Sequence, residues 1–197
     1  MDDPPFIGLT GSTGAGKSTV LAVLEKLGAA TISSDAIVHE LLSRGELRDL
    51  LVERWGEEVA PDGEVDRSRI AAIVFKDRDE LGWLESQLHP RVGARVAEWR
   101  EGLEPEVKLA VNEVPLLFET GMEAAFDAVL CVVAPLELRS ERAAGRGLAE
   151  LEGRDGRQIP EAEKAARSDF VVVNDGTREE LEARLDELLP ELETARK

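Results

Sequence analysis

The sequence predicts a three-layer α/β fold built around a five-stranded parallel sheet. Short, nearly continuous apolar runs alternate with segments of helical period, and a glycine-rich loop directly follows the first run. Runs this apolar are typical of parallel strands, because helices cover both faces of such a sheet. The strands are expected at residues 6–10, 29–32, 109–114, 128–133 and 170–173.

The glycine-rich loop at residues 11–18 carries the most specific local pattern. It reads Gly-Ser-Thr-Gly-Ala-Gly-Lys-Ser, the phosphate-binding P-loop pattern, and stands between the first strand and a helix expected at 18–27. Its glycines let backbone N–H groups turn toward phosphate oxygens, and the helix start adds partial positive charge. A Gly-rich turn before an ordinary helix does not require the full pattern, so a P-loop NTPase fold is predicted.

Each residue type in this loop has an expected role toward a nucleoside triphosphate. Lys17 is expected to reach the terminal phosphates, and the Ser18 hydroxyl is expected to ligate Mg²⁺. The nucleotide contacts are expected at Gly11, Thr13, Gly14, Ala15, Gly16, Lys17, Ser18 and Thr19.

The net charge is strongly negative, since 41 acidic residues stand against 24 basic ones and give −17. Binding to nucleic acid or to an anionic membrane is not expected, because both partners need a positive surface. A nucleotide is also polyanionic, so positive charge must be concentrated locally. One short segment supplies it, unless its arginines merely balance neighbouring Glu residues on a solvated helix: Arg139, Arg142, Arg146, Arg154 and Arg157.

The cysteine content and the N-terminal sequence bear on the cellular location of the protein. Cys131 is the only cysteine and lies in an apolar strand, so it is expected to be a small core residue without a disulfide. The acidic N-terminus does not resemble a signal peptide, and no apolar run is long enough to span a bilayer. A cytoplasmic protein is therefore expected.

A single domain spanning 1–197 is expected, made of a core and two insertions. The first insertion is expected to be helical and either forms a substrate-binding subdomain or only adds packing. The second is rich in Arg and Gly and is interpreted as a lid over the phosphates, with a disordered surface loop as the alternative. The expected bounds are 1–36, 105–135 and 168–197 for the core, 37–104 for the helical insertion and 136–167 for the lid.

Helices within the first insertion are expected at residues 39–51, from 77 or 78 to 88, and at 91–103. Pro90 is expected to separate the last two, because the residue before a proline disfavours helical backbone. The final helix of the chain is expected to begin with a capping box, Thr177 with Glu180.

Polar residues near the predicted strand ends are candidates for the acceptor side of a phosphoryl transfer. Asp35 follows the second strand, where it would accept a hydroxyl proton or cap the helix expected from Ala36. Glu113 ends the third strand and would hold a Mg²⁺-bound water or lie in solvent. His89, taken alone, is more often a structural residue than a catalyst.

Several blocks in the chain together resemble the dephospho-coenzyme A kinase family. Leu88-His89-Pro90 and the stretch from Val114 to Glu119 are more specific than the P-loop, and the resemblance covers nearly the whole length. The other blocks are Ile7–Gly11, Gly16–Val20, Leu27-Gly28, Asp35–Leu41, Phe75, Gln158, Lys164, Ser168-Asp169 and Asn174–Gly176.

The resemblance implies transfer of the ATP γ-phosphate to the ribose 3′-hydroxyl of dephospho-coenzyme A, the final step of coenzyme A biosynthesis. It implies that Asp35 is the catalytic base, that Lys17 and Arg142 are catalytic cations, and that Ser18 and Glu113 serve Mg²⁺. By the same resemblance, Arg142, Arg146 and Asn174 bind the nucleotide, and His89, Pro115, Leu116 and Glu119 join Asp35 in binding the substrate.

The chain departs from the family pattern at two strand ends. Ser33-Ser34-Asp35 stands where Asp-Ala-Asp is usual, and Glu113 stands where Asp is common. Another small-molecule or nucleotide kinase of the same fold is the alternative function. A regulatory GTPase is disfavoured, because the chain has no Asn-Lys-x-Asp tetrapeptide, and a non-catalytic nucleotide-binding module is the remaining class.

Overall fold

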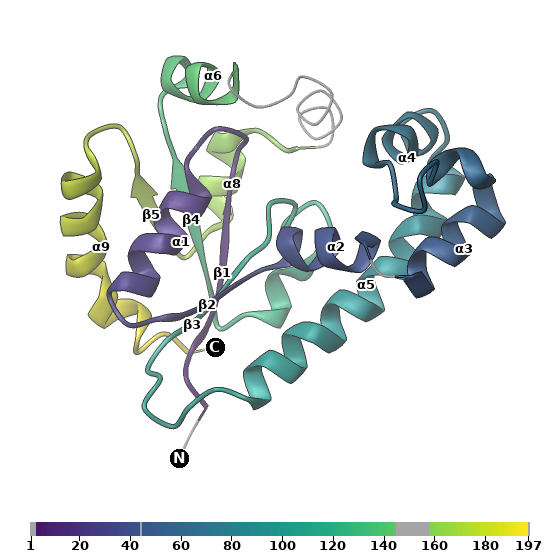
Figure 1. Ribbon diagram of the computed structural model, residues 1–197. Helices are drawn as coiled ribbons and strands as arrows, with labels where there is room; N and C mark the ends of the chain where they lie inside the picture. Colours follow the sequence, from purple (N-terminus) through teal and green to yellow (C-terminus); the bar gives the residue numbers. More distant parts are fainter. Residues whose placement is uncertain (1–2, 44, 145–157, 197) are drawn as a thin grey trace. The chain divides into compact units, whose positions relative to one another are not determined.

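The computed structural model describes residues 3–43, 45–144 and 158–196 and contains a five-stranded parallel sheet (Figure 1). The strand order is β2-β3-β1-β4-β5, so β1 lies in the middle between β3 and β4. The predicted fold class and all five strands are confirmed, with ends that differ by a residue at most. The strands are β1 (Phe6–Gly11), β2 (Ala30–Ser33), β3 (Ala110–Glu113), β4 (Ala128–Val133) and β5 (Phe170–Val173).

The chain divides into two compact units. The core unit consists of residues 1–33 and 102–197, and the helical unit is Ser34–Glu101. The bounds of the helical unit lie close to those expected for the first insertion. That the helical unit binds the substrate stays a prediction.

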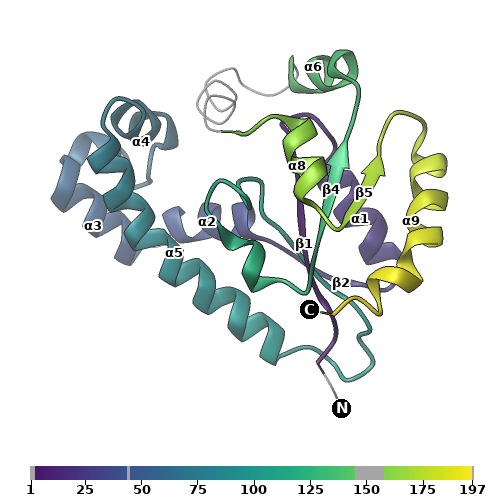
Figure 2. The ribbon, with the colours of Figure 1, turned by 180° about the vertical axis from the view of Figure 1, so that it is seen from behind.

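Helices cover both faces of the sheet in the core unit. The helices α1 (Lys17–Lys26) and α9 (Arg178–Leu192) pack together, and the ammonium of Lys26 pairs with Glu182. The helix α8 (Glu161–Arg167) contacts β1 and β4 and lies on the near side in Figure 2. A third helix, α6 (Leu136–Ala144), follows β4. Helix, sheet and helix make the three predicted layers.

Successive residues of β1 face opposite sides of the sheet. Ile7 and Leu9 are fully buried in the apolar cluster formed with α1 and α9. Gly8 faces the other way, where an added Cβ would lie 2.5 Å from Leu117 Cδ1 and 2.9 Å from Phe126 Cδ2. A glycine at this position lets the segment after β3 pack closely on the sheet.

The final helix starts as predicted. The Thr177 hydroxyl accepts from Glu180 N at 3.2 Å, and Glu180 Oε2 accepts from Thr177 N at 2.8 Å, so the capping box is complete. Leu181 and Leu185 are buried against the sheet, which fixes the orientation of α9 beside β5.

The helical unit packs around its own apolar cluster, which includes Leu47, Leu51, Ile70 and Leu84. A T-shaped contact between Trp55 and Trp83, with ring centroids 5.2 Å apart, adds to it. The elements are α2 (Ser34–Ser43), α3 (Gly45–Trp55), the 3₁₀ helix η1 (Glu57–Val59), α4 (Arg67–Val74) and α5 (Arg78–Glu101).

Two predictions about this unit are wrong. The residues of the helix expected at 39–51 belong to two helices, α2 and α3, and α4 was not predicted. Pro90 does not end a helix but lies inside the 24-residue α5. A proline removes one backbone donor, while the bonds on both sides remain. The carbonyl that loses its helical donor is that of Ser86, four residues before Pro90.

Part of the segment interpreted as a lid lies outside the described residues. This holds for Arg146, Arg154 and Arg157, and for the glycines that the sequence places among them. Arg139 and Arg142 lie on the described helix α6. Within the described ranges, no helix has both the length and the apolar character that crossing a membrane requires.

Candidate active site

The phosphate loop, residues 11–18, joins β1 to α1 at the carboxyl edge of the sheet. Gly14 has φ of 76° and Gly16 has φ of 97°, a left-handed backbone that disfavours other residues. An added Cβ on Gly14 would overlap Arg139 O, and one on Gly16 would overlap Asn174 Nδ2. Glycine is therefore required at both positions for two reasons: the backbone has positive φ, and neighbouring atoms leave no room for a Cβ.

Lys17 and Ser18 open the helix α1. Gly16 is the N-cap and makes no side-chain cap, so no side chain of the N-cap competes for the N–H groups at this helix start. The ammonium of Lys17 donates to Gly11 O at 2.9 Å and to Ser12 O at 3.2 Å. Ser18 is exposed and Thr19 half-buried. The loop thus carries backbone donors, one ammonium and one exposed hydroxyl, which are the groups that the sequence predicts for polyphosphate binding.

Asn174, which follows β5, packs on the phosphate loop from the side of the sheet. Its Nδ2 donates to Ala15 O at 2.8 Å, its backbone N–H donates to Val133 O at 2.8 Å, and it is 6% exposed. The Arg142 guanidinium donates to Asn174 O at 3.2 Å. The structure thus brings Asn174 and Arg142 together with the loop, while their contact with a nucleotide stays a prediction.

Thr13 at the tip of the loop is held on both of its backbone groups. Gln158 Oε1 accepts from Thr13 N at 3.1 Å, and Arg139 Nε donates to Thr13 O at 3.1 Å. Glu161 lies 3.4 Å from Arg139 Nη1 and completes the group. Gln158 was not predicted to bind the nucleotide. Arg139 was predicted only as one of five arginines that either supply positive charge to the nucleotide or balance neighbouring Glu residues.

The residue Glu113 ends β3 and is only 9% exposed. Its register partners are Ser33, the last residue of β2, and Leu9 on β1, which continues two residues further to Gly11. The alternative that Glu113 lies in solvent is therefore wrong. The buried carboxylate of Glu113 and the exposed hydroxyl of Ser18 are each oxygen groups of the kind that Mg²⁺ takes beside phosphates.

Across 3–43, 45–144 and 158–196, no three His, Cys, Asp or Glu side chains come together in a way that would hold an ion. Mg²⁺ commonly binds one or two protein groups plus substrate phosphates, so a preformed cage is not needed.

The segment after β3 contains three of the predicted substrate residues. Pro115 O accepts from Thr10 Oγ1 at 3.3 Å and from Lys164 Nζ at 2.8 Å. Leu116 is half-buried, and its carbonyl accepts from Thr120 Oγ1 at 2.8 Å. Glu119 Oε1 lies 2.8 Å from Lys164 Nζ in a buried ion pair. These residues are held by the protein itself, and substrate contact by any of them stays a prediction.

Asp35 and His89 belong to the helical unit. Asp35 is the second residue of α2, which begins at Ser34, so Asp35 is not the N-cap and that alternative is wrong. A carboxylate in the first helical turn is stabilised by the helix dipole. Asp35 is half-buried, and His89 is exposed on α5 next to Pro90.

Cys131 has no part in this chemistry. It is fully buried in β4, and burial raises the pKa of its thiol to about 11, with the charge of Glu161 as the second cause. A thiol with this pKa stays protonated at neutral pH and is a poor nucleophile.

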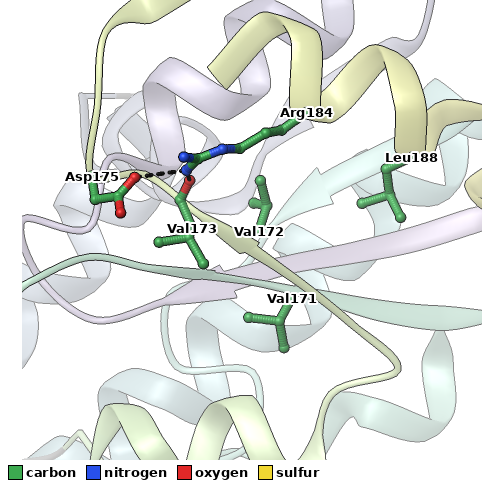
Figure 3. Close-up of a pocket in the computed structure, with 6 residues that line it drawn as sticks. All are labelled: Val171, Val172, Val173, Asp175, Arg184 and Leu188. Atoms are coloured by element: carbon green, nitrogen blue, oxygen red, sulfur yellow. Dashed lines mark hydrogen bonds and ion pairs between the residues drawn. The ribbon is translucent and has the colours of Figure 1, made fainter. Parts of the chain in front are cut away.

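A separate pocket of about 320 Å³ lies between β5 and α9 (Figure 3). Its cation, Arg184, donates to Val173 O at 2.5 Å and to Asp175 Oδ1 at 2.7 Å. The same guanidinium lowers the pKa of Asp175. Because both charges are paired with each other and with the strand, the pocket offers little to an ionic ligand. The other lining residues are Val171, Val172 and Leu188.

Comparison with known proteins agrees with the geometry. The sequence model described as dephospho-CoA kinase matches residues 5–180. The dephospho-CoA kinase of Deinococcus radiodurans is 41% identical over 198 residues, covering 96% of this chain and 93% of its own length. That of Thermus thermophilus is 38% identical over 192 residues, covering 96% and 92%.

Solved structures show the same similarity. A Thermus thermophilus protein known from its crystal structure superposes with a TM-score of 0.83 at 36% identity, covering 97% of this chain and 99% of its own. The dephospho-CoA kinase from Campylobacter jejuni gives a TM-score of 0.68 at 27% identity, covering 95% and 96%. With a phosphate loop, a strand-end carboxylate and a family match over nearly its whole length, this chain belongs to the dephospho-CoA kinase family.

Proposed function

We infer that the protein transfers the γ-phosphate of ATP to the ribose 3′-hydroxyl of dephospho-coenzyme A and releases coenzyme A and ADP. The observation that carries this inference is the family match over residues 5–180, joined to a phosphate loop whose required glycines are all present. The reaction is the last step of coenzyme A biosynthesis.

The donor half of the reaction depends on the core unit. Backbone N–H groups of the phosphate loop and the ammonium of Lys17 stabilise the charge that spreads over the phosphoryl oxygens. Lys17 already lies on the loop, bonded to Gly11 O, so it needs little rearrangement to meet a phosphate. Arg142 on α6 is the second cation, supported beside the loop by its bond to Asn174 O.

The acceptor half depends on a carboxylate. Asp35 orients the ribose hydroxyl and takes its proton as the new P–O bond forms, while the ADP oxygen leaves from the opposite side of the phosphorus. His89 and the segment from Pro115 to Glu119 are the proposed substrate side. Ser18 and Glu113 would hold Mg²⁺, which supplies charge neutralisation between the outer phosphates.

A cytoplasmic location and the absence of a nucleic-acid partner belong to the same proposal. The lone buried Cys131 suits a reducing compartment, and the net charge of −17 opposes binding to a polyanion other than the nucleotide.

The proposal is tested by following ADP release with Mg·ATP and a panel of acceptors. The panel contains dephospho-coenzyme A, adenosine, AMP and shikimate, with acceptor-free ATP hydrolysis as the background. We expect turnover well above background with dephospho-coenzyme A alone. Faster turnover with another acceptor would assign the protein to a different kinase activity of the same fold.

A further inference from the structure

Lys164 is the largest fully buried side chain among the described residues, with 0% exposure. A lysine is rarely buried to this degree unless its charge is paired, because removing an ammonium from water costs several kcal/mol. Its two partners are Glu119 Oε1 and Pro115 O, both at 2.8 Å from Nζ. The helix α8 is thereby fixed to the segment that follows β3.

Glu119 connects this pair to the residues just before α8. Its Oε1 accepts from Ile159 N at 2.9 Å as well as from Lys164, and its carboxylate is 7% exposed. The other oxygen, Oε2, is buried and has no hydrogen-bond partner among the described residues. The charge of Glu119 is therefore balanced by Lys164, and its geometry holds the backbone at residue 159.

Gln158 carries the connection to the phosphate loop. It is the neighbour of Ile159, and its Oε1 accepts the N–H of Thr13 at 3.1 Å. Arg139 holds the carbonyl of the same residue and pairs with Glu161, which opens α8. A continuous path of bonds thus runs from Lys164 through Glu119, Ile159 and Gln158 to Thr13.

We propose that Lys164 and Glu119 are positioning residues for the phosphoryl transfer, and that they act by holding Gln158 on Thr13 so that the phosphate loop is ordered before ATP arrives. This rests on the proposed function. Neither side chain needs to touch a substrate for this role, which differs from the substrate contact that the sequence resemblance implies for Glu119. An ordered loop binds more tightly, because the entropy of ordering is not lost at the moment of binding.

The first test replaces Gln158 by Met, which keeps the length of the side chain and removes its acceptor. We expect the Kd for Mg·ATP, measured by calorimetry, to rise about five- to tenfold, the usual consequence of losing one such bond. The KM for dephospho-coenzyme A should stay within about twofold, since Gln158 holds the donor loop. Exchange of the Thr13 amide hydrogen should become faster.

The second test separates positioning from stability. Lys164→Met leaves Glu119 buried and unpaired, so this single variant is expected to lose stability and to be difficult to interpret alone. In the double variant Lys164→Met with Glu119→Met both charges are gone, and such exchanges are often neutral for folding. We expect the double variant to have the melting temperature of the original protein. It should still bind Mg·ATP more weakly than the original protein, because Ile159 N has lost its acceptor.

Glu163→Gln is the matched control. It removes an exposed partner of Arg167, 3.8 Å away on the same helix, and leaves the path to Thr13 intact. Recovery of both melting temperature and ATP affinity in the double variant would overturn the proposal and leave a purely structural ion pair. ATP binding that is unchanged or tighter in Gln158→Met would overturn it as well.

These measurements are distinguishable from failure of the proposed function. ATP affinity and Thr13 exchange need no acceptor, so they report on positioning whatever the acceptor is. If the original protein bound Mg·ATP but did not phosphorylate dephospho-coenzyme A, the proposed function would fail while the positioning role was still tested.

Discussion

The side-chain amide of Asn174 donates to the carbonyl of Ala15 across 159 positions of sequence, at 2.8 Å and inside the protein. This bond fastens the end of β5 to the middle of the phosphate loop. It also explains why residue 16 is glycine, since an added Cβ there would overlap Asn174 Nδ2.

Asn174→Ala should lower both the stability of the protein and its affinity for ATP. The carbonyl of Ala15 loses its partner inside the protein, and we expect the free energy of unfolding to fall by about 1–2 kcal/mol. ATP binding should weaken several-fold, because the loop is less ordered. Urea denaturation and calorimetry measure the two effects. Asn174→Asp places a second acceptor against Ala15 O and should be worse than Asn174→Ala, so the reverse order would contradict the account.

Lys17→Ala should reduce the rate far more than it reduces stability. The ammonium is expected to stabilise the phosphoryl group in flight, and loss of such a group costs about 100- to 1,000-fold in kcat. Steady-state kinetics with saturating Mg·ATP and a thermal melt give the comparison. Lys26→Ala, at the other end of α1 and paired with Glu182 at the surface, is the control and should keep normal kcat. A Lys17→Ala enzyme of near-normal rate would remove Lys17 from the mechanism.

Asp35→Asn should separate catalysis from donor binding. An amide keeps the shape of the side chain but cannot accept the hydroxyl proton, so kcat is expected to fall about 100- to 10,000-fold. The Kd for Mg·ATP should be unchanged. Asp62→Asn, an exposed turn residue of the same unit, serves as the control. If Asp35→Asn turned over normally, another group would have to be the base, and a non-catalytic role for this position would follow.

Cys131 gives a prediction about pH. Its folded pKa of about 11 lies above the ordinary value of 9.0, so between these values the unfolded chain loses the thiol proton and the folded chain keeps it. The contribution of Cys131 to stability is therefore complete below pH 9 and falls by about 2 kcal/mol as pH rises to 11. The difference in unfolding free energy between the original protein and Cys131→Ala, from urea denaturation at pH 8 to 11, should shrink by this amount. A difference independent of pH would show that the thiol is not protected by burial.

The sheet and the phosphate loop could be predicted because their signals are local. Apolar runs mark buried parallel strands whatever lies elsewhere in the chain, and the loop pattern combines backbone freedom at Gly14 and Gly16 with the side chains of Lys17 and Ser18. The capping box at Thr177 is confirmed for the same reason, since its partner is three residues away.

The misplaced helix boundary shows where local rules compete. Pro90 disfavours helix at the preceding residue, yet α5 continues through it, because the cost of one lost bond is met by the remaining bonds of a long helix. The rule that a proline ends a helix considers one residue and leaves out the stability of the helix on both sides of it.

The contacts behind the site could not be predicted from sequence spacing. Gln158 meets Thr13 from 145 positions away, and Lys164 meets Pro115 from 49. Such pairs depend on how α8 packs against β1 and β4, which no periodicity reports. The resemblance did single out Gln158 and Lys164, but it gave no physical role to either.

The central claim is that phosphate passes from ATP to the ribose 3′-hydroxyl of dephospho-coenzyme A. It is tested most directly by incubating the protein with dephospho-coenzyme A and ATP labelled in the γ-phosphate, and by locating the label in the product by ³¹P NMR coupling to the ribose protons. The account predicts one new phosphomonoester, coupled to H3′, with ADP formed in equal amount. Label found only in inorganic phosphate, or on another hydroxyl, would contradict it.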